Sequence, residues 1–129
     1  MSTPFRIHGF PKPPLVAGAD LSGNQFRFVK AGTAEGLAAP FAAATDRPIG
    51  VQADRPRAGE AGDFVAFGIA EVVAGAAINY GVEIGVDAQG RAIPAGAGAY
   101  ICGYALSAAS AVGDRLSVFV NLVNPPRHA

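Results

Sequence analysis

Short apolar runs, separated by turn residues at roughly even spacing, constrain the fold of this chain more than any other feature of its sequence. In one of them Phe26 and Phe28 alternate with polar neighbours, as expected of a strand with one buried face. Repetition of such runs is typical of a β-sandwich or a β-barrel. The candidate strands span residues 25–30, 49–52, 64–67, 69–73, 82–86, 100–106 and 116–120.

The clearest local feature is the segment of residues 82–94, VEIGVDAQGRAIP, which predicts a β-hairpin. Alternating apolar residues lead into residues 87–90, which have the composition of a tight turn. Gly90 is expected to occupy a turn position with positive φ, where only glycine sits without strain. Glu83 and Arg91 are expected to lie on a solvated rim of this hairpin.

The 129-residue chain is long enough for one domain with its own core. We expect a single compact all-β domain over residues 21–123, a sandwich or barrel of about seven to nine short strands. Residues 1–20 are expected to form an extended, proline-rich N-terminal arm, and residues 124–129 a short C-terminal tail. Alanine-rich residues 33–45 allow a helical turn or two, which Pro40 would interrupt.

The N-terminal arm combines prolines with large apolar side chains, which a purely solvated tail would not favour. Proline fixes φ, so such a segment loses little further entropy when it is held in an extended form. We therefore expect the arm to lie on a partner protein, although an ordinary frayed terminus is the alternative. The candidate partner-binding residues are Phe5, Arg6, Ile7, Phe10, Leu15 and Val16.

The charge composition argues for protein partners and against nucleic acid or membrane. Charged residues make up only 16% of the chain, below the usual quarter, and such uncharged surface tends to form interfaces. The formal net charge is zero, so no basic excess is available for nucleic acid or anionic lipid. Residues 92–113 are uncharged, but their glycines and Pro94 favour a loop followed by a strand over a membrane span. No secretory signal precedes the domain, so synthesis in the cytoplasm is expected.

Residues that usually carry catalysis are few and scattered. His8 and His128 lie near the two termini and are expected to be solvated, without the supporting residues that a catalytic base or metal site needs. Cys102 lies in a candidate strand and is expected to be buried and inert. The glycines of residues 95–100 lack the spacing of a phosphate-binding loop. We therefore expect no catalytic residues, no metal and no cofactor.

The order of segments resembles the capsid cement or head decoration proteins of tailed bacteriophages. The similarity runs from about Leu15 to Leu122. It rests on PIGV with AGE downstream, on AEVVAGAAI leading into the VDAQGRA hairpin, and on the closing GDRLSVFV. None of these is a catalytic motif, and the residues before Leu15 and after Leu122 lie outside the resemblance.

The resemblance implies a small, all-β, non-enzymatic structural protein of the virion. Such proteins add to the outside of an assembled icosahedral shell, often as trimers and in some relatives as dimers. They stabilise the shell by non-covalent contacts at junctions between major capsid protein subunits. The expected partners are thus the major capsid protein and further copies of this chain, with a homotrimer favoured and a dimer possible.

Two other functions fit the sequence. A small-ligand or glycan-binding β-domain could use Tyr80, Tyr100 and Tyr104 as stacking surfaces, and it would need a concave pocket with convergent polar groups. An enzyme with a carboxylate site assembled only in the fold would need a cluster of perturbed acids in a cleft.

Overall fold

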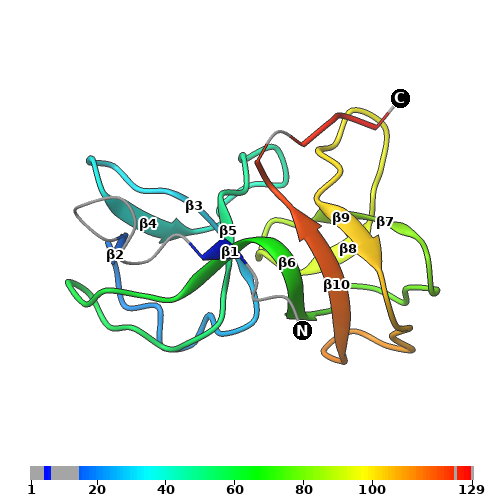
Figure 1. Cartoon of the computed structure of the whole chain (residues 1–129), viewed down its shortest axis with the longest axis horizontal. Helices are drawn as coiled ribbons and strands as arrows, with labels where there is room; N and C mark the ends of the chain where they lie inside the picture. The colour runs from blue at the N-terminus through cyan, green and yellow to red at the C-terminus, as the bar shows by residue number, and fades with distance from the viewer. Residues whose placement is uncertain (1–4, 7–14, 124, 129) are drawn as a thin grey trace.

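The computed structural model describes residues 5–6, 15–123 and 125–128, and these residues form ten β-strands (Figure 1). No helix occurs among these residues, so the all-β prediction is confirmed. The strands are β1 (Phe5–Arg6), β2 (Val16–Ala17), β3 (Phe28–Ala31), β4 (Leu37–Pro40), β5 (Gly50–Gln52), β6 (Phe64–Val73), β7 (Glu83–Val86), β8 (Ala92–Pro94), β9 (Gly103–Ala105) and β10 (Arg115–Asn121).

All the strands belong to one hydrogen-bonded sheet, in the order β2-β4-β3-β5-β6-β10-β9-β7-β8, with β1 beside β6. Only the β2–β4 pair is parallel among the strand pairs of the described residues. The path is open, because it ends at β2 and at β8. In Figure 1, β6 runs from the half of the molecule that holds β2 to β5 into the half that holds β7 to β10. β6 therefore links the two halves.

The long β10–β6 pair is the centre of the fold. Leu116, Val118 and Val120 of β10 are buried, while the residues between them are exposed or half-buried. This alternation follows from strand geometry, in which successive side chains point to opposite faces. One face of β10 therefore packs on the core, and the other faces outward.

Two hydrophobic cores lie on the sheet, and β6 contributes to both. The larger core includes Val72 of β6, Val118 of β10 and Ile84 of β7. At the start of β6, Val65 belongs to the larger core and Phe64 to the smaller one. The buried residues that pack with Phe64 in the smaller core are Ala17, Leu21, Val29 and Ala38.

The predicted hairpin is confirmed as β7 and β8, which pair antiparallel around the turn. Gly90 has φ 80°, as predicted, and a Cβ there would lie 2.7 Å from the carbonyl oxygen of Phe28. The Asp87 carboxylate accepts hydrogen bonds from the backbone N–H groups of Gln89 and Arg91. It also accepts one from Arg91 Nε at 2.8 Å, so the prediction of a merely solvated Arg91 is wrong.

Two local predictions are wrong. Residues 33–45 contain no helical turn, because β4 pairs with β3 and β2 and these ladder bonds decide the conformation. Phe26 does not share a strand with Phe28. It has φ 65°, in the left-handed region, and its N–H donates to the carbonyl oxygen of Gln52. The strand begins only at Phe28.

The strand count and the strand ends also differ from prediction. Residues 64–67 and 69–73 were predicted as two strands but form the single strand β6. Gly68 lies within this strand and has φ 125°. β1 and β2 raise the total to ten, above the predicted seven to nine, and each has only two residues. Strands this short show no alternation that a sequence pattern could detect.

The residues described contain no helix that is long and apolar enough to cross a membrane. Residues 92–113, the uncharged stretch, instead form β8, a loop, β9 and the loop that follows β9.

Candidate functional site

The outward face of β6, β10 and β9 carries a row of large apolar side chains. Phe119 of β10 lies opposite Ile69 of β6 and opposite Tyr104 of β9. Directly opposite residues of paired strands point to the same face of a sheet. The three side chains therefore stand together on the side away from the larger core.

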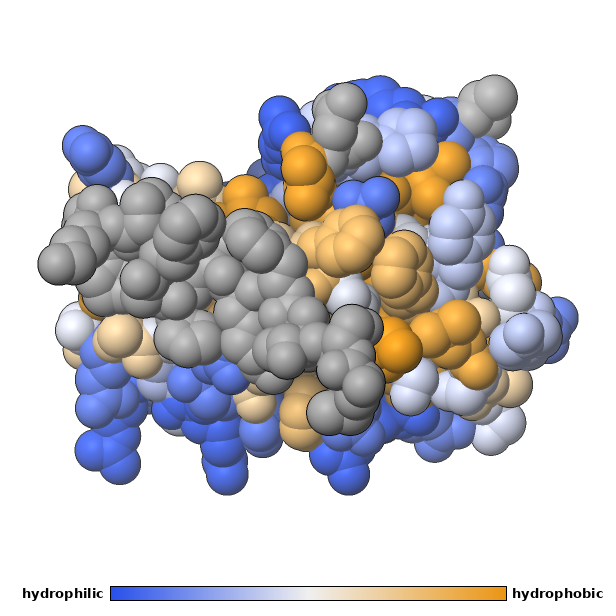
Figure 2. Space-filling view, viewed as in Figure 1, coloured by the Kyte–Doolittle hydropathy of each residue, from blue (hydrophilic) through white to orange (hydrophobic). Residues whose placement is uncertain are grey.

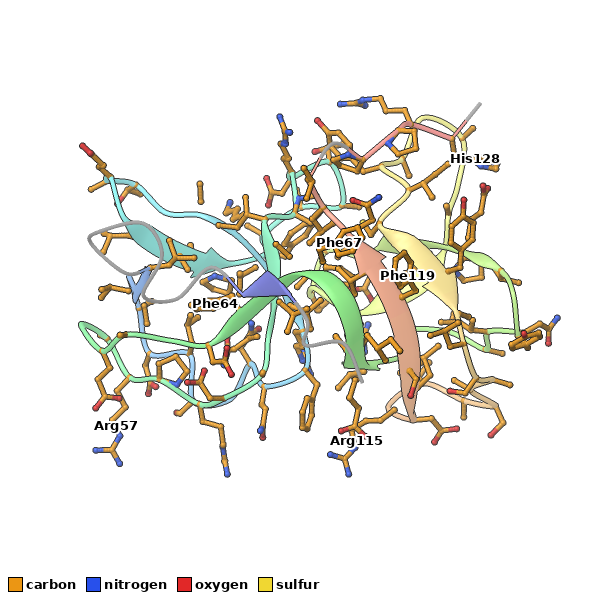
Figure 3. All side chains as sticks on the ribbon, in the orientation of Figure 1. Arg57, Phe64, Phe67, Arg115, Phe119 and His128 are labelled. Carbon is orange, nitrogen blue, oxygen red and sulfur yellow. The ribbon has the colours of Figure 1, made fainter. Side chains whose placement is uncertain are left out.

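Phe67 and Leu106 extend this row. The rings of Phe67 and Phe119 meet edge to face, with centroids 5.4 Å apart, and they lie side by side in Figure 3. The N–H of Leu106, just after β9, donates to the carbonyl oxygen of Ser117 on β10. Figure 2 shows hydrophobic residues gathered over the region of β10 and β9. We call the set the apolar face: Phe67, Ile69, Tyr104, Leu106 and Phe119.

The apolar face is open to solvent. Ile69 is 60% exposed, Tyr104 49%, and Phe67 and Leu106 are each 40% exposed. With large side chains of roughly 150 to 250 Å² each, these fractions leave on the order of 400 Å² of apolar surface in water. Contiguous patches of this size on a monomer are often binding sites.

Charges of both signs border the apolar face. At one end, Arg115 Nη1 of β10 lies 3.8 Å from Glu71 Oε2 of β6, and both side chains are about half exposed. The Arg115 guanidinium also lies over the ring of Phe26, 5.0 Å from its centroid. Beside Tyr104 lies Glu83 of β7, its cross-strand neighbour. The border therefore has no strong excess of either charge.

The structure corrects the expectation for His128. Its Nδ1 lies 3.1 Å from Glu83 Oε1, and its backbone N–H donates to the carbonyl oxygen of Ala99. His128 is therefore held against the domain and not simply solvated. His8 lies outside the described residues.

Cys102 is buried, as predicted, and burial raises the pKa of its thiol to about 12. A thiol with a raised pKa is protonated at neutral pH and is a poor nucleophile. Among the described residues no group of three or more histidine, cysteine, aspartate or glutamate side chains could hold a metal ion.

Two hollows lie on the described surface, and a charged side chain in each is already engaged in contacts within the domain. One, of about 220 Å³, is lined by Tyr100 and Arg127 among others. The Arg127 guanidinium stacks on Tyr100 and donates to Gly98 O at 3.0 Å and to Tyr100 Oη at 2.9 Å. The other, about 520 Å³ and shallow, includes Asp114. Hydrogen bonds from the Ser110 hydroxyl and from the backbone N–H groups of Ala111 and Ser110 lower the pKa of Asp114.

Comparison with known proteins decides the family. The phage cement protein family matches residues 15–122, which is most of the chain. The chain belongs to the phage cement protein family. The resemblance seen in the sequence is confirmed. Its limits, about Leu15 to Leu122, agree with the residues that the family matches. This cement protein is thus a structural protein of the bacteriophage, associated with the capsid of the virion.

A solved structure shares the fold of this cement protein. It is the head fiber gp8.5 N base of bacteriophage phi29, with a TM-score of 0.65 over 94% of this chain and 95% of that one. The two sequences are 18% identical, so the likeness concerns the fold alone. No curated protein matches the sequence.

Four of the predicted partner-binding residues are described by the structure, and they lie in two separate places. Phe5 and Arg6 form β1, which pairs antiparallel with β6, Phe5 opposite Phe67 and Arg6 opposite Val65. The arm thus reaches β6 at Phe67, a member of the apolar face. Ile7 and Phe10 lie outside the described residues.

Leu15 and Val16 lie elsewhere, at the β2 end of the sheet path. Leu15 is half-buried and packs against the smaller core. The N–H of Val16 donates to the carbonyl oxygen of Gly36 at 2.9 Å, and Val16 forms a bridge with Ala61. Three strands, β4, β3 and β5, separate β2 from β6 along the sheet path.

The apolar face was not predicted from the sequence. A signal was present, because both alternating phases of residues 64–70 are apolar where a half-exposed strand should have one polar phase. The pattern is hard to recognise when residues 64–67 and 69–73 are treated as two strands separated by Gly68. The register that places Phe119 between Ile69 and Tyr104 was also unknown from sequence.

Proposed function

We propose that the protein binds the outside of an assembled phage capsid and stabilises the shell by non-covalent contacts at junctions between major capsid protein subunits. The observation that supports this most is the family match over residues 15–122. The low charge content of the chain agrees with it, since uncharged surface is suited to protein contacts. The proposed location is the capsid surface of the virion, after synthesis in the host cytoplasm.

The proposed contacts come from the N-terminal arm of residues 1–20, which precedes a β domain of residues 21–123 and a short tail. β1 already pairs with a strand of the sheet, so the arm has backbone that can form ladder hydrogen bonds. In the same way it can add to a strand of a neighbouring subunit. Repetition over the shell then multiplies weak contacts through avidity. The proposed contact residues are Phe5, Arg6, Ile7 and Phe10, with Leu15 and Val16 at the base of the arm.

We also propose that the protein acts as a homo-oligomer, with a trimer favoured over a dimer. Each added copy increases the number of arms that can engage the shell at once. Binding by linked arms is tighter than binding by one arm, provided that all can reach their sites.

Capsid stabilisation is tested by a heat challenge of phage heads. Heads that lack the protein are expected to release DNA at a lower temperature than heads to which purified protein has been added back. DNA release is followed with a dye excluded from intact heads, and serum albumin serves as the control protein. Equal release temperatures, despite bound protein, would contradict a stabilising role.

Deleting residues 1–14 is expected to weaken capsid binding at least tenfold, which corresponds to about 1.4 kcal/mol. The reason is the loss of apolar side chains whose burial stabilises a complex by roughly 1.5 to 3 kcal/mol each before ordering costs. Co-sedimentation with expanded empty capsids over a concentration series measures the effect. Circular dichroism should show that the remaining β domain is folded.

Matched substitutions distinguish the contribution of the arm's apolar side chains to capsid binding from that of its polar side chains. The double variant Phe5→Ala, Phe10→Ala is expected to bind as weakly as the deletion. Ser2→Ala with Lys12→Ala, in the same segment, is expected to bind like the natural chain. Superimposable binding curves for the natural and shortened chains would show that the arm does not contact the capsid.

A further inference from the structure

We infer that the apolar face is the surface on which a second copy of this chain docks. The inference deepens the proposed homo-oligomer, as a two-fold contact that corresponds to the dimer and not to the trimer, and it rests on that part of the proposed function. It assigns the contact between copies to the outward sides of β6, β10 and β9, and leaves the arm for the capsid.

The backbone of these strands restricts how a partner can bind. β10 is paired with β6 on one side and with β9 on the other, and β9 is paired with β10 and β7. The backbone groups of β9 and of the adjoining part of β10 are therefore already used, so an extended peptide has no free strand edge to join between these strands. A partner that covers β10 and β9 instead packs against side chains, as one sheet packs on another.

A second copy offers a surface of matching kind and size. Sheet-on-sheet packing needs two apolar faces whose side chains interdigitate about 10 Å apart. Two copies would remove roughly 800 Å² of apolar surface from water, and the polar border would bring the total toward the 1,200 to 2,000 Å² of a standard interface. The apolar face together with its polar border therefore approaches the area that a stable contact between copies requires.

The border charges favour the same chain over a partner of one charge sign. Glu71 and Arg115 lie together at one end of the face, half exposed and 3.8 Å apart. A partner of one sign would be attracted by one of these groups and repelled by the other. A symmetry-related copy brings Glu71 of each chain toward Arg115 of the other, so both groups gain a contact.

The test is the mass of the full chain in solution, measured by sedimentation velocity over a wide concentration series. The natural chain is expected to associate beyond the 13.0 kDa monomer. Ile69→Glu and Tyr104→Glu are each expected to weaken self-association at least tenfold, because each places an unpaired charge inside the contact. Val112→Glu is the matched control, since Val112 is 59% exposed on the loop before β10 and outside the apolar face.

Charge reversal tests the arrangement of the two copies. Glu71→Arg and Arg115→Glu are each expected to weaken self-association, and the two together in one chain are expected to restore it. Because the double variant also restores the Glu71–Arg115 pair within each chain, folding is checked separately by thermal melts of all three variants. The expected result is weaker association in single variants that melt like the natural chain.

Several outcomes would overturn the inference. One is a natural chain that stays monomeric at every concentration, and another is an Ile69→Glu variant with unchanged association. A monomeric natural chain whose capsid binding is lost in Ile69→Glu would assign the face to the capsid instead. Failure of the proposed function is distinct, because then the natural chain does not co-sediment with capsids whatever its mass.

Discussion

Gly103→Ala is expected to lower the free energy of unfolding by about 3 to 5 kcal/mol, from backbone strain together with overpacking. Gly103 has φ 152° and lies buried in β9, between Val120 of β10 and Ile84 of β7. A Cβ at this position would collide with the carbonyl oxygen of Phe119. Backbone atoms within a paired sheet cannot move aside without breaking ladder bonds, so the collision cannot be relieved locally.

Denaturant unfolding of the purified domain measures this effect. Gly96→Ala is the matched control, because a Cβ there meets no atom within 4 Å. Its unfolding free energy is expected to stay within about 0.5 kcal/mol of the natural chain, as for most surface substitutions. Equal stabilities for the two variants would show that β9 does not approach β10 as closely as described.

The parts of the fold that the sequence predicts are those decided by neighbouring residues. The hairpin of β7 and β8 is one, because Asp87 accepts hydrogen bonds from residues two and four positions later and Gly90 supplies the positive φ. β10 is another, because its alternation is regular along the strand. Both depend on local chemistry that a single sequence contains.

The parts that the sequence fails to predict depend on distant residues. The segment of residues 33–45 forms a strand because β3 and β2 lie beside it, which outweighs the helix preference of alanine. Phe26 leaves the strand because its backbone bonds to Gln52 and Val73. Such partners become known only once the chain is folded.

The buried Gln52 illustrates the same limit. It is fully buried, and its Nε2 donates to the carbonyl oxygens of Leu21 and Asp54 at 2.6 and 2.8 Å. Its Oε1 accepts from Asn24 Nδ2 at 3.1 Å. The sequence shows only a polar residue at the end of a short apolar run, whereas the fold uses it to join its own segment to the turn of residues 21–24.

For the site, the sequence directs attention to the arm and away from the sheet. Apolar residues among prolines are visible in one segment, so Phe5 and Phe10 stand out. The apolar face draws its members from three strands, and only the pairing register brings Ile69, Phe119 and Tyr104 together. The family, by contrast, was predictable, because its pattern of turns and small residues runs along the chain.

Two phenylalanines of β6 separate the core from the apolar face within one strand. Phe64 is fully buried in the smaller core, whereas Phe67 is 40% exposed on the apolar face. Phe64→Ala is expected to lower the free energy of unfolding by about 3 to 5 kcal/mol, through lost burial and the cavity left behind. Phe67→Ala should cost no more than about 1.5 kcal/mol, chiefly the lost ring contact with Phe119.

The same pair should behave in the opposite way in self-association. Phe67→Ala is expected to weaken association because it removes part of the apolar face, while Phe64→Ala should retain it under conditions in which the domain is folded. Denaturant unfolding and sedimentation velocity on both variants give the four values needed. The two residues share a strand, a residue type and a substitution. They differ only in the side of β6 on which the side chain lies. A Phe67→Ala variant as unstable as Phe64→Ala would mean that the outward side of β6 is core, and that the apolar face is not available to a second copy.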